Sequence, residues 1–342
     1  MARRWQWTIL VCFLLSGSAG LIYEVVWSRL LGLLYGNTVL AVSTVLAAFM
    51  AGLALGSALL GRYADRHSQP LRLYALIEWC IGAYALLLPL LFGGLPVLAP
   101  LLGHPLPRFL IIFLLLLPPT VGMGGTLPIL SAVFRHGQIA SQVGRLYAWN
   151  TFGAVAGVAL AGFVLLPHLG MRYTTLVAVA VNAVAGGIAL GVSRRLPQPA
   201  RVHPPPTTAG PCNPDNPPSA IRHPHVLGAF ALSGAVAMLY EVAWTRGLTL
   251  VLGSSTYAFS IMLVAFLSGL ALGSALMSRV IDRLRHPWLT LVLCQAGIGL
   301  TGLGGLYLFG QLPALFLGLF ALLGTSYTWL LLGKLMLAVS VM

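Results

Sequence analysis

The segment SGSAGLIYEVVWSRLLGLLYGNTVLAVSTVLAAFMAGLALGSALLGRYADR occupies residues 16–66, and a second copy of it occupies residues 233–283. The copies align without a gap at an offset of 217, and 26 of the 51 positions are identical. Apolar composition alone would produce matched leucines. It would not produce the matched polar and aromatic residues Tyr23/Tyr240, Glu24/Glu241, Trp27/Trp244, Arg29/Arg246 and Asp65/Asp282. The chain therefore contains an internal duplication.

The composition places this duplication in a membrane. Apolar residues make up 58% of the chain and charged residues only 7%, whereas a soluble domain carries about 25% charged residues. Apolar spans recur along the whole chain, which excludes an isolated signal peptide as the explanation. The net charge of +13 comes from basic residues that separate the spans and form no continuous patch, so no nucleic-acid partner is expected.

The apolar segments predict an all-α, polytopic bundle embedded in a lipid bilayer, because a membrane-spanning helix needs about 20 mostly apolar residues. The predicted spans are 8–34, 40–61, 71–91, 109–130, 146–166, 173–192, 226–252, 257–277 and 288–308. A further apolar region, 312–342, is too long for one span. The repeat offset predicts a tenth span that starts near Ser326, preceded by a partly buried loop or short helix over 312–324.

A proline-rich segment divides the chain. We predict a first repeat of six helices over 1–192, a solvated linker over 193–225 and a second repeat over 226–342. An even number of spans separates equivalent positions, so the two repeats share one orientation, as in the halves of major facilitator transporters. Adding the offset to Gly122 gives 339, so the second repeat is expected to be incomplete in its fourth helix.

The distribution of arginine predicts the orientation. With the N-terminus inside and the spans alternating, 14 arginines fall on inside segments and only Arg108 and Arg172 on outside loops. Positive charge accumulates on the cytoplasmic side of membrane proteins. We therefore expect a bacterial-type inner (cell) membrane protein whose N-terminus is cytoplasmic.

The motif GLALGSAL, residues 52–59 and again 269–276, carries glycines four residues apart on one helix face. Small residues at this spacing let two membrane helices approach closely. The GRYADR segment that follows predicts a short cytoplasmic turn. We give equal weight to two interpretations: a latch between conformations, and a charged turn that only sets the topology. The candidate latch residues are Arg62, Asp65, Arg66, Arg279, Asp282 and Arg283.

Glu24 and Glu241 lie well inside their predicted helices, where a charge is costly and marks a function or an internal partner. Arg29 follows Glu24 by five residues, about 140° around the helix, so the two make a poor pair within one helix. The repeat suggests instead that Glu24 pairs with Arg246 and Glu241 with Arg29, which would clamp the halves together. The alternative is a solute or proton site with aromatic walls. The candidate residues for both are Tyr23, Glu24, Trp27, Arg29, Tyr240, Glu241, Trp244 and Arg246.

Glu78 lies in the third span, and its repeat counterpart is Gln295. We interpret it as a side chain that snorkels to the cytoplasmic surface, with a titrating group as the alternative. No set of residues combines acid–base, nucleophile or metal-ligand spacing. The sequence therefore indicates no cofactor and no metal site, and it does not favour an enzyme.

The tyrosine–glutamate–tryptophan–arginine run, GLALGS, GMGGTLP (122–128) and GRLYAWNTFGAVAG (144–157) together resemble the membrane region of spermidine-synthase-like proteins, the fused major-facilitator/spermidine-synthase family. The similarity covers nearly the whole chain. Members of that family typically carry a soluble aminopropyltransferase-like domain after the membrane region, and no segment here has its strand, glycine-rich turn and acidic residues. The resemblance therefore implies no catalytic residues in this chain.

The resemblance implies the membrane domain of a polyamine-related protein. One expectation is that this domain moves or hands over a small solute between its two halves, and two glutamates between aromatic side chains suit a cation. The alternative is a membrane anchor that transports nothing and positions a soluble aminopropyltransferase-like domain or partner. Loss of solute uptake in Glu24→Gln and Glu241→Gln variants would favour the first, and loss of assembly alone the second.

Overall fold

The computed structural model describes residues 3–35, 38–94, 104–134, 139–195, 224–252, 255–280 and 287–323, together with Gly333, and these residues are helical apart from short turns. The helices of the first half are α1 (Arg3–Tyr35), α2 (Thr38–Arg66), α3 (Pro70–Gly93), α5 (Pro105–Ser131), α6 (Ile139–Leu160) and α7 (Leu166–Arg195). Those of the second half are α8 (Pro224–Leu252), α9 (Ser255–Val280) and α10 (Pro287–Leu323).

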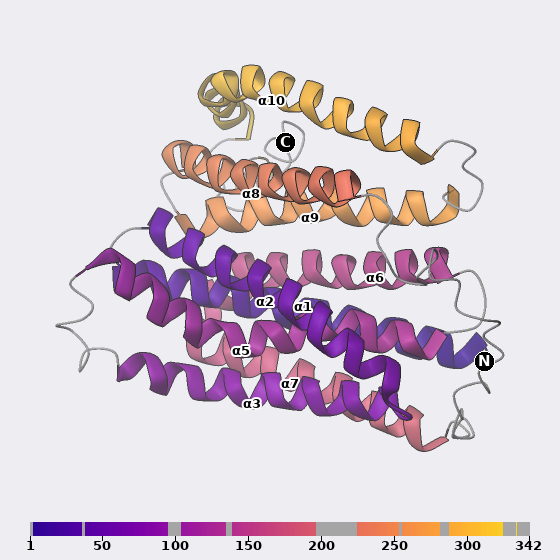
Figure 1. The fold of residues 1–342 in the computed structure, drawn as a ribbon. Helices are drawn as coiled ribbons and strands as arrows, with labels where there is room; N and C mark the ends of the chain where they lie inside the picture. Colours follow the sequence, from indigo (N-terminus) through magenta and orange to yellow (C-terminus); the bar gives the residue numbers. More distant parts are fainter. Residues whose placement is uncertain are drawn as a thin grey trace.

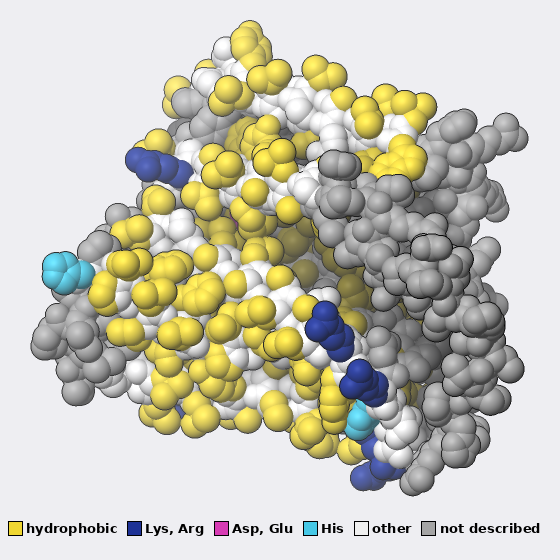
Figure 2. Space-filling model, in the orientation of Figure 1, with side chains coloured by type: hydrophobic (Ala, Val, Ile, Leu, Met, Phe, Trp, Pro, Cys, Tyr) yellow, Lys and Arg dark blue, Asp and Glu magenta, His cyan; other side chains and the backbone are white. Residues whose placement is uncertain are grey.

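Eight helical segments in the described residues are long and apolar enough to cross a membrane. Figure 1 shows the helices lying side by side along one common direction. Their outer flank is covered with hydrophobic side chains, while arginine side chains lie near the helix ends and no acidic side chain is visible on this face (Figure 2). This arrangement is that of a bundle whose flank is solvated by lipid. It confirms the predicted all-α, polytopic fold.

The longest apolar segment, Gln142–Arg195, contains two spans joined by a sharp turn. A five-residue π-helix, η3 (Ala161–Leu165), connects α6 to α7, and Gly170 adopts φ 72° and ψ 176° inside the assigned α7. This backbone region is accessible essentially only to glycine. Gly170 therefore lets the chain leave one span and enter the next within a few residues.

We expect Gly170→Ala to destabilise the protein by about 1–3 kcal/mol, because a Cβ at this backbone conformation is strained whatever space surrounds it. Thermal unfolding in detergent measures the effect. Gly191→Ala is the matched control, since Gly191 has no atom within 4 Å of a built Cβ and lies in regular helix. A variant at Gly170 as stable as the control would show that the turn is not strained.

Glycines set the close contacts inside the first half. A Cβ at Gly52 would overlap Thr120, and one at Gly56 would overlap the Val121 carbonyl oxygen, so α2 and α5 pack backbone against backbone. The predicted role of this glycine pair is confirmed. In the second copy, Gly269 and Gly273 have no described atom within 4 Å of a built Cβ.

The remaining packing follows from the same small residues. Gly153 and Gly157 of α6 lie against the Leu14 and Ser18 carbonyl oxygens of α1. Helix α3 packs on α7. The halves meet where α6 packs on α9, with smaller contacts of α1 on α9 and α2 on α8. A single buried apolar cluster contains residues of α1, α2, α8 and α9, so the core is continuous across the halves.

Two boundaries differ from the sequence-based expectation. Helix α10 runs without interruption from Pro287 to Leu323, whereas we expected a loop or separate short helix over 312–324. The segment is apolar throughout, which favours continued helix over an exposed loop in a membrane setting. The predicted tenth span near Ser326, and most of the linker, lie outside the described residues.

Candidate solute-binding site

Glu24 and Glu241 occupy equivalent positions in α1 and α8, and both side chains are buried, at 4% and 2% exposure. One carboxylate oxygen of each, Oε1 of Glu24 and Oε2 of Glu241, has no hydrogen-bond partner among the described residues. Their chain neighbours Tyr23 and Val25 on α1 and Val242 on α8 belong to, or pack against, the same buried apolar cluster. Two acids thus share one apolar region without a described basic partner.

Arg29 and Arg246 are both exposed, and neither forms an ion pair with Glu24 or Glu241 in the described part of the chain. The structure therefore does not bring together the expected pairs Glu24–Arg246 and Glu241–Arg29. The cause is local geometry. Each arginine follows its glutamate by five residues, so it projects from a different side of the helix, and Arg29 lines the cavity described below.

We expect Arg29→Gln and Arg246→Gln to change the unfolding free energy by less than about 0.5 kcal/mol each, because exposed side chains without ion pairs contribute little. Thermal unfolding of the purified protein in detergent measures this. A cross-repeat clamp would instead make each substitution strongly destabilising, since it would leave a buried glutamate without its partner.

The aromatic residues beside the glutamates pack differently in the two copies. Tyr23 stacks on Trp27 with ring centroids 5.4 Å apart, and Trp27 lies 5.7 Å from Phe49 in a tilted arrangement. Both rings are buried in the core, although the Tyr23 hydroxyl has no hydrogen-bond partner. Tyr240 and Trp244 are only half-buried, and Tyr240 lies close to Gly302 of α10. The first copy therefore packs its aromatic pair, and the second leaves its pair accessible.

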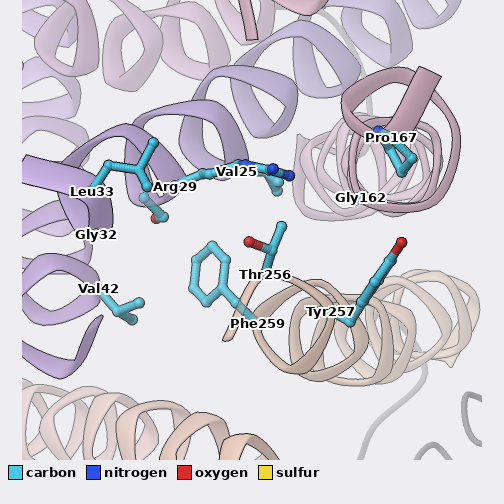
Figure 3. A pocket seen from close by; sticks show the side chains of 11 residues that line it. Val25, Arg29, Gly32, Leu33, Val42, Gly162, Pro167, Thr256, Tyr257 and Phe259 are labelled. Atoms are coloured by element: carbon cyan, nitrogen blue, oxygen red, sulfur yellow. The ribbon is translucent and has the colours of Figure 1, made fainter. Parts of the chain in front are cut away.

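A cavity of about 380 Å³ lies one turn along α1 from Glu24, where α1, α2, α9 and the α6–α7 junction meet. Arg29 is the charged residue in its lining, and the Ser28 hydroxyl beside it is buried without a hydrogen-bond partner. Figure 3 shows Arg29 extending between α1 and Pro167, with Thr256 and Tyr257 of α9 on the facing side. The cavity is therefore a polar space at the seam between the halves.

The predicted latch residues end two helices. Arg62 and Arg66 are exposed in the last turns of α2, and Arg279 is exposed at the end of α9. The side chain of Asp65, and all of Asp282 and Arg283, lie outside the description. The GRYADR segment itself is helical rather than the turn we expected, because the chain does not turn until 67–69, where His67 N donates to the Ala64 carbonyl oxygen at 3.2 Å. A basic residue in the last helical turn suits the helix dipole.

Glu78 is fully buried on α3, with 0% exposure. It does not snorkel, as the sequence-based interpretation proposed. The missed signal lies in the repeat itself, where Ser16 precedes Glu78 by the same interval as Ser233 precedes Gln295.

The comparisons with known proteins support this architecture. The chain is 27% identical over 193 residues to a polyamine aminopropyltransferase of Corynebacterium efficiens. This alignment covers 54% of this chain and 35% of the relative. It is 29% identical over 188 residues to polyamine aminopropyltransferase 1 of Streptomyces coelicolor, which covers 54% of this chain and 33% of that relative. The chain thus aligns with about a third of the length of these curated relatives. No solved structure matches it.

The names of these relatives confirm the resemblance to spermidine-synthase-like proteins. The family model of the Major Facilitator Superfamily matches residues 8–341, almost the entire chain. The helical bundle and the duplicated segments agree with that match. This protein therefore belongs to the Major Facilitator Superfamily.

Proposed function

We propose that this chain is the membrane domain of a polyamine aminopropyltransferase-like protein and that it transports a small cationic solute between its two halves. The observation that carries the proposal is the pair of buried carboxyl groups of Glu24 and Glu241, each with one oxygen atom that has no hydrogen-bond partner among the described residues. The superfamily and the polyamine-related names of the relatives support the same conclusion.

The electrostatics of the pair favour a cationic solute. Two neighbouring carboxyl groups repel each other when both are ionised, and an apolar environment weakens that repulsion less than water does. An ammonium group between them removes the repulsion and forms charge-assisted hydrogen bonds with the unpartnered oxygens. A polyamine carries several ammonium groups on an apolar stem, so its chemistry matches two acids within an apolar region.

The seam between the halves supplies a route for such a solute. Transporters of parallel-repeat architecture bind substrate near the repeat interface and expose it to alternate sides by rocking of one half against the other. Glu24 and Glu241 come one from each half, so a bound cation would hold both halves at once. The cavity beside Arg29 lies on the same seam and would form part of the path rather than the cation site, because its charged lining residue is basic.

Uptake into proteoliposomes tests the proposal. The full-length protein is reconstituted, and accumulation of radiolabelled putrescine and spermidine is followed. We expect saturable uptake, reduced about tenfold or more by Glu24→Gln or Glu241→Gln, since each lost charge-assisted contact is worth at least about 1.4 kcal/mol. Arg246→Gln is the matched control and is expected to retain uptake. Equal uptake by the control, the wild type and both glutamine variants would refute the cation site.

An anchor without transport is the second candidate. It is favoured by the observation that the chain aligns with only about a third of relatives named as aminopropyltransferases. An anchor predicts no uptake of either amine, together with membrane association of aminopropyltransferase activity that is lost when the helices are removed. Uptake that depends on the two glutamates would exclude it.

The orientation and domain limits belong to the same proposal. We infer a cytoplasmic N-terminus, repeats over 1–192 and 226–342, an inner-membrane location and a latch role for the ends of α2 and α9. The arginine distribution supports the orientation. Labelling of single cysteines introduced at Arg66 and Arg108 by an impermeant thiol reagent in intact cells, in a background lacking the native cysteines, distinguishes the two sides. Only the cysteine at position 108 is expected to react.

A further inference from the structure

Glu78 is a third buried acid, away from the pair at the seam. It lies on α3 with 0% exposure, and the Ser16 hydroxyl of α1 donates a hydrogen bond to its Oε1 atom at 2.5 Å. The second carboxylate oxygen, Oε2, has no partner. This acid therefore holds one fixed hydrogen bond and one open oxygen within the first half.

The surroundings of Glu78 contain polar groups but no described base. Asn182 of α7 donates from Nδ2 to the Glu78 backbone oxygen at 3.3 Å, and its Oδ1 atom is unpartnered. Tyr74 on α3 donates to the Cys12 carbonyl oxygen at 3.0 Å, and its hydroxyl also interacts with Glu78. Cys12 and Tyr23 are the buried titratable residues of α1, the helix that supplies Ser16, besides Glu24. Helix α5, also packed on α3, presents Gly122 to the apolar Ile77 and Ile81.

The second repeat contains the same contact with the charge removed. Ser233 and Gln295 are the counterparts of Ser16 and Glu78, and Gln295 Nε2 donates to the Ser233 hydroxyl oxygen at 2.8 Å. Glutamine has nearly the shape of glutamate and is neutral. The helix contact is therefore formed equally by an amide, and packing alone does not require an acid at position 78.

The placement of the acid strengthens this point. Gln295 is exposed, whereas Glu78 is completely buried. A charge is costly inside the bilayer at both positions, yet position 78 keeps an acid where the helix contact does not require one. Buried acids in membrane helices mark substrate or ion pathways, or proton relays.

We propose that Glu78 is a proton-binding site of the first half. The proton binds the free Oε2 atom of the carboxylate while the Ser16 hydrogen bond to Oε1 is retained. It leaves to water when α1, α3 and α7 separate enough to hydrate the carboxylate. Coupling of this proton to solute movement rests on the transport function proposed above, whereas binding of the proton does not.

Infrared spectroscopy of the full-length protein in lipid nanodiscs tests proton binding directly. In a background carrying Glu24→Gln and Glu241→Gln, which removes the other two buried glutamate carboxyl groups of the described residues, we expect an absorption band from a protonated carboxyl group that disappears as pH rises and is missing once Glu78→Gln is added. Ser16→Ala in the same background is the matched control: it keeps Glu78, so the band is expected to remain, at a shifted frequency because the hydrogen bond to Oε1 is lost. The Glu78→Gln variant should fold, because the Ser233–Gln295 pair shows that glutamine maintains this contact. In that background, an identical band with and without Glu78→Gln, or a band that responds to Na⁺ and not to pH, overturns the proposal.

Proteoliposome transport tests the coupling separately. In Glu78→Gln, accumulation driven by a pH gradient is expected to fall to the level seen without a gradient, while exchange of labelled for unlabelled putrescine continues. Glu24→Gln is expected to lose both activities. Gradient-driven accumulation that is unchanged in Glu78→Gln overturns the coupling. If the wild type transports neither amine, the proposed function fails, and the infrared result still decides whether Glu78 binds a proton.

Discussion

Replacing both Glu24 and Glu241 with glutamine is expected to raise the unfolding temperature at neutral pH, while it eliminates binding of the cationic solute. The reason is that each glutamate buries a carboxyl group with an unpartnered oxygen, and both acids lie beside one apolar cluster. A neutral amide of the same shape removes the mutual repulsion and much of the desolvation cost. Thermal unfolding in detergent, without added amine, measures the gain.

Addition of spermidine supplies the internal control. The wild type is expected to gain stability with increasing spermidine, because a ligand that binds only the folded state stabilises it. The double variant is expected to show no such gain. A clamp in which each glutamate holds an arginine predicts the opposite sign, namely a double variant that unfolds several degrees earlier than the wild type. A fall in unfolding temperature would therefore refute the solute site and restore the clamp.

Substituting leucine for Gly153, or for Gly52, is expected to cost about 3 kcal/mol or more and to abolish a monodisperse, folded protein. A Cβ at Gly153 would overlap the backbone carbonyl oxygen of Leu14, and one at Gly52 would overlap Thr120. Neither contact can be relieved by rotating a flexible side chain. The two helices would have to move apart, which would disrupt the whole contact between α1 and α6 for Gly153, or between α2 and α5 for Gly52.

Gly187→Leu is the matched control, because Gly187 is exposed on α7 and has no atom within 4 Å of a built Cβ. We expect it to remain folded and to gain slightly in helix propensity. Size-exclusion chromatography and thermal unfolding in one detergent compare the three variants. If Gly153→Leu eluted and unfolded like Gly187→Leu, the close approach of α1 and α6 would be wrong.

The sequence was sufficient for the features that depend on spacing within one helix. Apolar length predicted the spans, and the four-residue interval from Gly52 to Gly56 predicted a close helix contact that the structure contains. The duplicated register placed Glu24 and Glu241 in equivalent positions, and the structure buries both. These features follow from helix geometry alone.

Contacts between helices were harder to predict from the sequence. The expected pairing of Glu24 with Arg246 and of Glu241 with Arg29 required knowledge of which way each arginine points from its helix; Arg29 lines the cavity at the seam, and Arg246 is exposed. Burial of Glu78 depends on Ser16, 62 residues away, and on Asn182, 104 residues away. The position of Glu78 along α3 suggested that its side chain reaches the cytoplasmic surface. The packing of α1 and α7 against α3 instead decides how exposed Glu78 is. Tertiary neighbours of this kind have no local periodicity.

The glycine contacts have a mechanical consequence. Within the first half they join backbone to backbone, as at Gly56 on the Val121 carbonyl oxygen, so these helices have almost no freedom to slide. Between the halves the contacts are different, because Gly144 and Gly162 of the α6–η3 segment face the side chains of Ser278 and Ser260 on α9. Serine side chains are small, and at these two positions no backbone carbonyl oxygen faces the glycine, so α9 is held less rigidly against α6 than α5 is against α2. The helix pairs α1–α6 and α2–α5 are accordingly expected to move as units, and relative movement is left to the seam with α9 and to the helices outside these two pairs.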